Sequence, residues 1–197
     1  MNYPINFRFK LIALAPQIYV TDADGKTICY VKQKLFRFKE KVEVFTDESR
    51  QQLLATIEAD RIIDWSARYT FKAPNGQVLG AVGRRGLKSL WRAHYDVFGP
   101  GETTPTFAIQ EANPFTKMLD GIVGEIPIIG IFAGYMLHPR YVASRVDGGT
   151  AVVSLTKKAS LFERRFTLVQ EGPADEGEQL ALLLSFLMMN LLERARG

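Results

Sequence analysis

The sequence has few of the residues that catalytic and metal sites need. Its 197 residues include one cysteine, Cys29, and two histidines, His94 and His138. A lone cysteine excludes an internal disulfide framework and is typical of a reducing compartment, so we expect a cytoplasmic protein. The histidines and Cys29 form no metal-binding spacing, and no Ser-His-Asp order has the context of a nucleophile elbow. We therefore expect no metal, no cofactor and no enzymatic activity.

Export signals and membrane-length apolar runs are also missing. The N-terminal apolar run, 11–15, is shorter than the core of about 7–15 residues that a signal peptide needs. The C-terminal run, Leu180 to Leu192, is apolar except for Ser185 and Asn190. It is also too short, because a membrane-spanning helix needs about 20 apolar residues. We expect neither export nor a transmembrane helix.

The C-terminal run instead predicts a helix with no polar face. At 100° per residue, apolar side chains fall on every side: Leu180, Leu184, Leu187 and Leu191 on one, with Leu182, Phe186 and Met189 opposite. A helix that is apolar all round must be enclosed on all sides. Acidic residues precede it and Arg194 and Arg196 end it, as the helix dipole favours. The segment is therefore a buried helix with favourable ends.

Three stretches of the chain repeat one pattern. They are DADGKTICYVKQK (22–34), PNGQVLGAVGRR (74–85) and VDGGTAVVSLTKK (146–158). Each has an Asp-Gly or Asn-Gly turn, then a strand-like run, then basic residues; such turns are strong hairpin signals. The likeness continues in SLWRAHYDV (89–97) and SLFERRFTL (160–168). An internal repeat of hairpins indicates a mainly β architecture.

The repeats predict about a dozen antiparallel strands. We expect them near 7–15, 17–21, 27–34, 40–46, 53–58, 66–72, 77–84, 92–98, 104–110, 140–146, 150–157 and 164–170. Closure into a barrel removes exposed edges, and a twelve-stranded bore leaves room beyond that of an eight-stranded barrel. A helix is about 10–12 Å across, so the C-terminal helix fits that room. We expect 1–197 to be a single domain: a closed, about twelve-stranded antiparallel β-barrel around a central hydrophobic C-terminal helix.

Two other patterns are better explained by structure than by a ligand. Asp22, Asp24 and Gly25 resemble the start of a calcium loop, but the later ligand positions do not fit, and a hairpin turn explains them. The glycines of GAVGRRG (80–86) lack the spacing of a nucleotide-binding loop. Glycines within a strand more often mark a bend or the close approach of another backbone. We adopt that interpretation.

The hairpin repeats, the SLW and SLF strands and the final apolar helix together resemble the LURP-one-related proteins. The likeness is closest in IYVTDADGKTICYVKQKLFRFKEKVEVF (18–45) and YTFKAPNGQVLGAVGRRGLKSLWRAHYDV (69–97). This family shares the tubby C-terminal-like fold with the phospholipid scramblases. The resemblance implies a twelve-stranded barrel around a hydrophobic helix. It implies little chemistry, because members include tubby proteins that bind phosphoinositides, scramblases and uncharacterised proteins.

One segment, 113–139, interrupts the repeat. It is apolar from Ile122 to Leu137 except for Glu125, and Pro127 shortens the clean run below the length of a membrane span. One interpretation is a short helix near 114–121 followed by a loop or second helix across a barrel mouth. The alternative is a surface that docks a membrane or a protein partner, since exposed apolar patches usually mark interaction.

Basic residues are the main lead to a ligand in a chain of net charge +4. They form three groups: Lys26, Lys32, Lys34, Arg37, Lys39 and Lys41; Arg84, Arg85, Lys88 and Arg92; and Lys157, Lys158, Arg164 and Arg165. These groups fall at equivalent places in the three repeats, so some of them are candidates to gather at one rim. As residues that bind anionic lipid we select Lys32, Lys34, Arg37, Lys39, Arg84, Arg85, Lys88, Arg92, Lys157 and Lys158. The alternative is that they are solvated strand ends.

Two functional hypotheses remain. The first is a non-enzymatic module that binds anionic phospholipid or phosphoinositide head groups, or associates with membranes as scramblases do, peripherally at the membrane surface. The second is a soluble structural or regulatory module that binds a protein partner through 113–139 and has no lipid role. Nucleic acid is not expected as a partner, because aromatic residues do not interleave with the basic groups as in RNA-binding modules.

Overall fold

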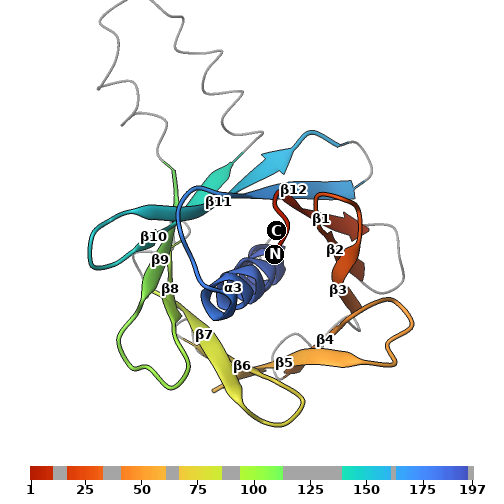
Figure 1. The fold of residues 1–197 in the computed structure, drawn as a ribbon, viewed down its shortest axis with the longest axis horizontal. Helices are drawn as coiled ribbons and strands as arrows, with labels where there is room; N and C mark the ends of the chain where they lie inside the picture. Colours follow the sequence, from red (N-terminus) through yellow and green to blue (C-terminus); the bar gives the residue numbers. More distant parts are fainter. Residues whose placement is uncertain are drawn as a thin grey trace, which may run out of the picture.

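The chain forms a closed β-barrel threaded by its C-terminal helix (Figure 1). A computed structural model describes residues 1–10, 17–32, 41–60, 67–85, 94–112, 139–160 and 163–194. Each of the twelve strands pairs antiparallel with its neighbours in the chain, and β1 (Ile5–Lys10) pairs with β12 (Glu163–Gln170) to close the ring. The helix, α3 (Glu176–Arg194), lies in the bore. The fold class predicted from the sequence is confirmed.

The remaining strands follow the predicted pattern of repeats. They are β2 (Gln17–Thr21), β3 (Thr27–Lys32), β4 (Lys41–Phe45), β5 (Leu53–Ala59), β6 (Arg68–Lys72), β7 (Val78–Arg84), β8 (His94–Phe98), β9 (Phe107–Glu111), β10 (Arg140–Arg145) and β11 (Ala151–Lys158). The first repeat supplies β2–β5 and the second supplies β6–β9. The third supplies β10–β12, and β1 takes the place beside β12 where a fourth strand would lie. The N-terminal strand therefore completes the last repeat.

The first strand begins earlier than the sequence suggested. We expected it near 7–15, but β1 begins at Ile5, which faces the core and pairs with Leu168. Strand alternation explains the start, since Ile5, Phe7 and Phe9 are buried and the residues between them are exposed. The part of that expectation beyond residue 10 lies outside the described residues, as does the helix expected near 114–121.

The helix begins with a capping box. The backbone N–H of Glu178 donates to Asp175 Oδ1 over 2.8 Å, and the N–H of Asp175 donates to Glu178 Oε2 over 3.1 Å. This reciprocal pair satisfies N–H groups that a helix start leaves without partners. Arg145, at the end of β10, donates to both oxygens of Glu178 over 2.8 and 2.9 Å. The first turn is thus fixed to the barrel wall.

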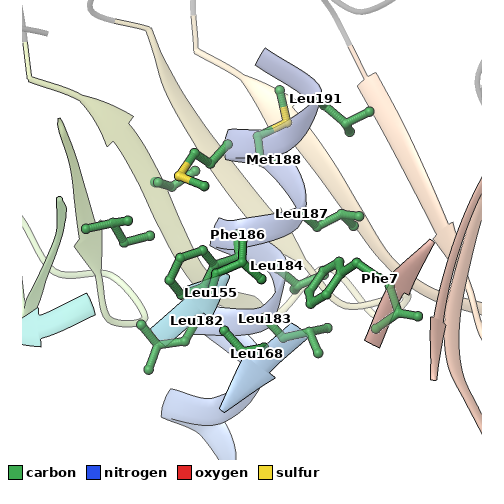
Figure 2. Packing of buried hydrophobic residues seen from close by; sticks show 14 of the residues in the cluster. Phe7, Leu155, Leu168, Leu182, Leu183, Leu184, Phe186, Leu187, Met188 and Leu191 are labelled. Atoms are coloured by element: carbon green, nitrogen blue, oxygen red, sulfur yellow. The ribbon is translucent and has the colours of Figure 1, made fainter. Parts of the chain in front are cut away.

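The middle of α3 is buried around its whole circumference. Leu182, Leu183, Leu184, Phe186 and Leu187 point in different directions, and each is 0% exposed (Figure 2). Side chains of the wall, including those of Phe7, Leu155 and Leu168, point at the helix from β1, β11 and β12. The two polar residues in the run bond to the helix's own carbonyls: Ser185 Oγ to Ala181 O over 2.7 Å, and Asn190 Nδ2 to Phe186 O over 2.8 Å. The bore is therefore a packed core.

Helix and wall approach each other closely at Gly80 in β7. This residue has φ +144°, and a Cβ there would lie 2.8 Å from Phe98 O and 3.2 Å from the Cβ of Ala181 on α3. Only glycine fits that position without a shift of the backbone. The interpretation of this glycine as a point of close backbone approach is confirmed.

Candidate functional site

Basic residues cluster at one mouth of the barrel. Because successive strands are antiparallel, the last residues of the odd-numbered strands and the first residues of the even-numbered strands lie at the same mouth. Seven of these twelve strand ends are Lys or Arg: Lys10, Lys32, Lys41, Arg68, Arg84, Arg140 and Lys158. Two are acidic, Glu111 and Glu163. We call this mouth the basic rim; the C-terminal end of α3 lies there, since Glu193 shares a pocket with Lys157.

The opposite mouth has the opposite charge. Its connections are 22–26, 46–52, 73–77, 99–106, 146–150 and 171–175. They carry eight acidic residues, Asp22, Asp24, Asp47, Glu48, Glu102, Asp147, Glu171 and Asp175, and two basic ones, Lys26 and Arg50. We call this mouth the acidic rim; the N-terminal end of α3 lies there, with further acids in its first turn. The barrel is therefore polarised along its axis.

The structure describes five of the ten basic residues selected from the sequence. These five lie at the basic rim: Lys32 on β3, Arg84 on β7, Arg85 directly after β7, and Lys157 and Lys158 on β11. Segments distant in the sequence thus meet at one mouth. Five others are outside the described residues: Lys34, Arg37, Lys39, Lys88 and Arg92. Lys26, a member of the first basic group, lies at the acidic rim and does not join them.

The placed cations differ in whether an acid neutralises them. Arg85 pairs with Asp96 over 3.2 Å, and Arg84, which is largely buried, lies 4.0 Å from Glu193. Lys32, Lys157 and Lys158 have no acidic partner among the described residues. These three lysines are therefore the selected residues best suited to an anionic ligand.

A pocket of about 200 Å³ opens at the basic rim beside the end of α3. Its lining comes from β1, β10, β11, β12 and the helix, and consists of Phe9, Pro139, Tyr141, Lys157, Arg164, Phe166, Asn190 and Glu193. Register shows which strand residues face inward, because paired residues share one face of the sheet. Lys157 pairs with the buried Phe166, and Arg164 pairs with the buried Phe9. The side chains of Lys157 and Arg164 therefore face the inside of the barrel, at the open end of the core.

The carboxylate in the pocket is engaged by other residues. Tyr95, which is fully buried on β8, donates its hydroxyl to Glu193 Oε1 over 2.6 Å. The guanidinium of Arg84 lies 4.0 Å from the same oxygen and 5.9 Å from the centre of the Tyr95 ring. These contacts attach the last turn of α3 to β7 and β8. They also direct the charge of Glu193 toward Arg84.

Several residues at this mouth could not be recognised from the sequence alone. Tyr95, Glu193 and Asn190 were not considered as site residues, and Arg164 was placed in a basic group but not among the selected residues. Alternation along β11 and β12 was the signal that separates Lys157 and Arg164 from Lys158 and Arg165, their outward neighbours. Glu193 carried no such signal, because its partners come from β7 and β8.

Other sites are not formed in the part of the chain that the structure describes. No three His, Cys, Asp or Glu side chains come together there in a way that would hold a metal ion. Among the same residues, no helix has the length and apolarity to cross a membrane. Cys29 is buried on β3, and burial raises the pKa of its thiol to about 12.

The architecture and comparisons with known proteins agree on the class. A closed twelve-stranded barrel around its own C-terminal helix is what the resemblance to tubby-like barrels implied. Residues 27–123 match the model of the LURP-one-related family, which confirms the resemblance seen in the sequence. The X-ray structure of an Arabidopsis thaliana protein is similar over 100% of this chain and 94% of its own, with a TM-score of 0.52 and 14% identity. That similarity concerns the fold. No curated protein matches the chain.

Proposed function

We propose that this barrel is a non-enzymatic module that binds anionic phospholipid head groups and associates peripherally with the membrane through its basic rim. The observation that carries the proposal is the segregation of charge: basic strand ends at one mouth and eight acidic residues at the other. An anionic surface attracts the first mouth and repels the second. The polarity thus favours one orientation, with the C-terminal end of α3 toward the lipid.

The energy available from the rim is large enough to matter. Each Lys or Arg near an anionic leaflet contributes about 1 kcal/mol. The pocket residue Arg164 also has no acidic partner in the described ranges, so with Lys32, Lys157 and Lys158 it makes four un-neutralised cations. Four such contributions give about 4 kcal/mol, roughly a thousandfold in affinity. Such attraction weakens with salt, because the screening length is about 8 Å at physiological ionic strength.

Vesicle sedimentation tests the proposal. The protein is mixed at low salt with phosphatidylcholine vesicles that contain or lack phosphatidylserine or a phosphoinositide. We expect binding only to the anionic vesicles, and weaker binding as salt rises. A double variant, Lys32→Glu with Lys158→Glu, should bind at least about tenfold more weakly. The matched control, Lys26→Glu with Arg50→Glu, reverses two charges at the acidic rim and should leave binding unchanged or weaken it only slightly.

Two results would reject the proposal. One is indifference of the wild-type protein to anionic lipid at low salt. The other is an equal loss in both double variants, since net charge and not the basic rim would then govern binding.

The alternative function depends on 113–139, of which only Pro139 is described. A protein partner for that segment stays a prediction. A pull-down with and without the segment tests it, provided that circular dichroism shows the deletion variant to be folded.

A further inference from the structure

We propose that the pocket at the end of α3 binds a phosphate monoester, with Lys157 and Arg164 as its two anion-binding residues. The inference deepens the proposed function and rests on it in one respect: it takes the basic rim as the face that meets the ligand. It adds a preference, for a terminal phosphate over a phosphodiester, that a merely basic surface would lack.

The two cations line the same pocket from neighbouring strands. Lys157 pairs with Phe166, and Arg164 lies two residues from Phe166 on the same strand, so the cations are diagonal neighbours on the inner face. Such neighbours are about 7–8 Å apart at their backbones, within reach of long side chains directed at a common centre. Arginine supplies a planar fork of donors that matches phosphate oxygens, and lysine supplies a point charge. A single phosphate group suits this pair.

The charge of the pocket also favours a dianion. Neither Lys157 nor Arg164 has an acidic partner among the residues described, and the nearby Glu163 is taken by Arg165 over 3.0 Å. The pocket's own carboxylate, Glu193, accepts from Tyr95 and faces Arg84. The two remaining positive charges match a phosphate monoester, which carries about −1.5 to −2 at pH 7.

Size and lining restrict the rest of the ligand. A cavity of about 200 Å³ holds a phosphate and a few further atoms, not a whole phospholipid. Phe9 and Phe166 contact each other edge to face, with ring centres 5.6 Å apart, and with Tyr141 and Pro139 they supply the apolar half of the lining. A monoester presents three free oxygens to the cations, whereas a diester presents two and must place a substituent on each side. The geometry therefore points to a terminal phosphate, either on a lipid or on a small soluble ester.

Titration with glycerol 3-phosphate, followed by calorimetry, tests the soluble source. We expect saturable binding to the wild-type protein. The pocket variant, Lys157→Gln with Arg164→Gln, should bind at least about tenfold more weakly, as expected from loss of hydrogen bonds to a charged group. The control variant, Lys26→Gln with Arg50→Gln, removes two positive charges at the acidic rim, the opposite mouth of the barrel, and should bind as the wild type does.

Vesicles test the lipid source. Phosphatidic acid has a terminal phosphate and phosphatidylglycerol a diester, so the two are compared in phosphatidylcholine vesicles at matched surface charge. We expect the wild-type protein to prefer phosphatidic acid by at least about fivefold, a preference that needs roughly 1 kcal/mol. The pocket variant should bind both vesicles equally, at the level that the remaining rim supports.

The outcomes separate this inference from the proposed function. Equal binding of the two lipids, with no binding of glycerol 3-phosphate, overturns the inference and leaves the anionic-membrane function standing. Saturable glycerol 3-phosphate binding without vesicle binding supports the pocket and rejects the membrane role. Unchanged glycerol 3-phosphate affinity in the pocket variant also overturns the inference, because Lys157 and Arg164 would then contribute nothing to binding of the phosphate ester. If that variant does not fold, Arg164→Lys keeps the charge, loses the fork, and should weaken binding severalfold in a folded protein.

Discussion

Truncating the side chains of α3 one at a time tests whether the helix is enclosed on all sides. Leu183→Ala, Leu184→Ala, Phe186→Ala, Met188→Ala and Met189→Ala sample its whole circumference, and each of these residues is fully buried. An amphipathic helix has a face where such changes cost almost nothing. This helix should have none.

The expected magnitude follows from burial. Leu→Ala or Met→Ala in a packed core costs about 2–5 kcal/mol and Phe→Ala about 3–5 kcal/mol, from lost transfer energy and the cavity left behind. Total stability is typically about 5–15 kcal/mol, so each variant should remain folded but weakened. In a chain of this size 1 kcal/mol lowers Tm by roughly 2–4 °C, so a loss of about 3 kcal/mol lowers it by about 6–12 °C.

Urea unfolding followed by circular dichroism measures these losses. Val169→Ala is the control, since this strand residue is 41% exposed and truncation there should cost less than about 0.5 kcal/mol. One position of the five that behaves like the control would refute the reasoning, because that face of the helix would then have no wall against it.

Three further predictions concern single positions. Gly80→Ala should destabilise the protein by about 1–3 kcal/mol more than Gly76→Ala, since both have positive φ but only the Cβ at Gly80 meets backbone, and thermal unfolding of the pair measures the difference. Tyr95→Phe should cost about 1–2 kcal/mol in urea unfolding, because Glu193 loses the 2.6 Å hydroxyl bond; a cost near zero would mean that the last turn of α3 is not attached there. Cys29 should resist iodoacetamide at pH 8 and react only on unfolding, as mass spectrometry can show. Because its pKa is raised from 9.0 to about 12 on folding, the unfolded chain loses this proton first, so the contribution of Cys29 to stability should fall as pH rises from about 9 to 12.

The fold could be predicted because each of its elements has a strong local signal. The Asp-Gly and Asn-Gly turns mark the hairpins at Gly25 and Gly76, where the backbone adopts positive φ. The helix was identified because no orientation of Leu180–Leu192 leaves a polar face. Repeats then supplied the number of strands, and that number fixed a bore wide enough for the helix.

The pocket could not be predicted in the same way, because it depends on register and on the depth of α3. A shift of one residue between β11 and β12 would turn Lys158 inward and Lys157 outward. In the sequence the two lysines are adjacent and form one basic cluster. That pattern alone does not show that Lys157 faces the pocket and Lys158 faces outward. Glu193 and Asn190 reach the pocket only because α3 lies at one particular height in the bore.

Closure of the barrel by β1 and β12 has a consequence for how the chain is made. Ile5 can pair with Leu168 only after Leu168 has left the ribosome, and α3, which fills the bore, is translated later still. Until then the apolar faces of the strands already synthesised have nothing to cover them. Such long-range pairing folds slowly, so the nascent chain should depend on chaperones until β12 and α3 have been synthesised and can join the other strands.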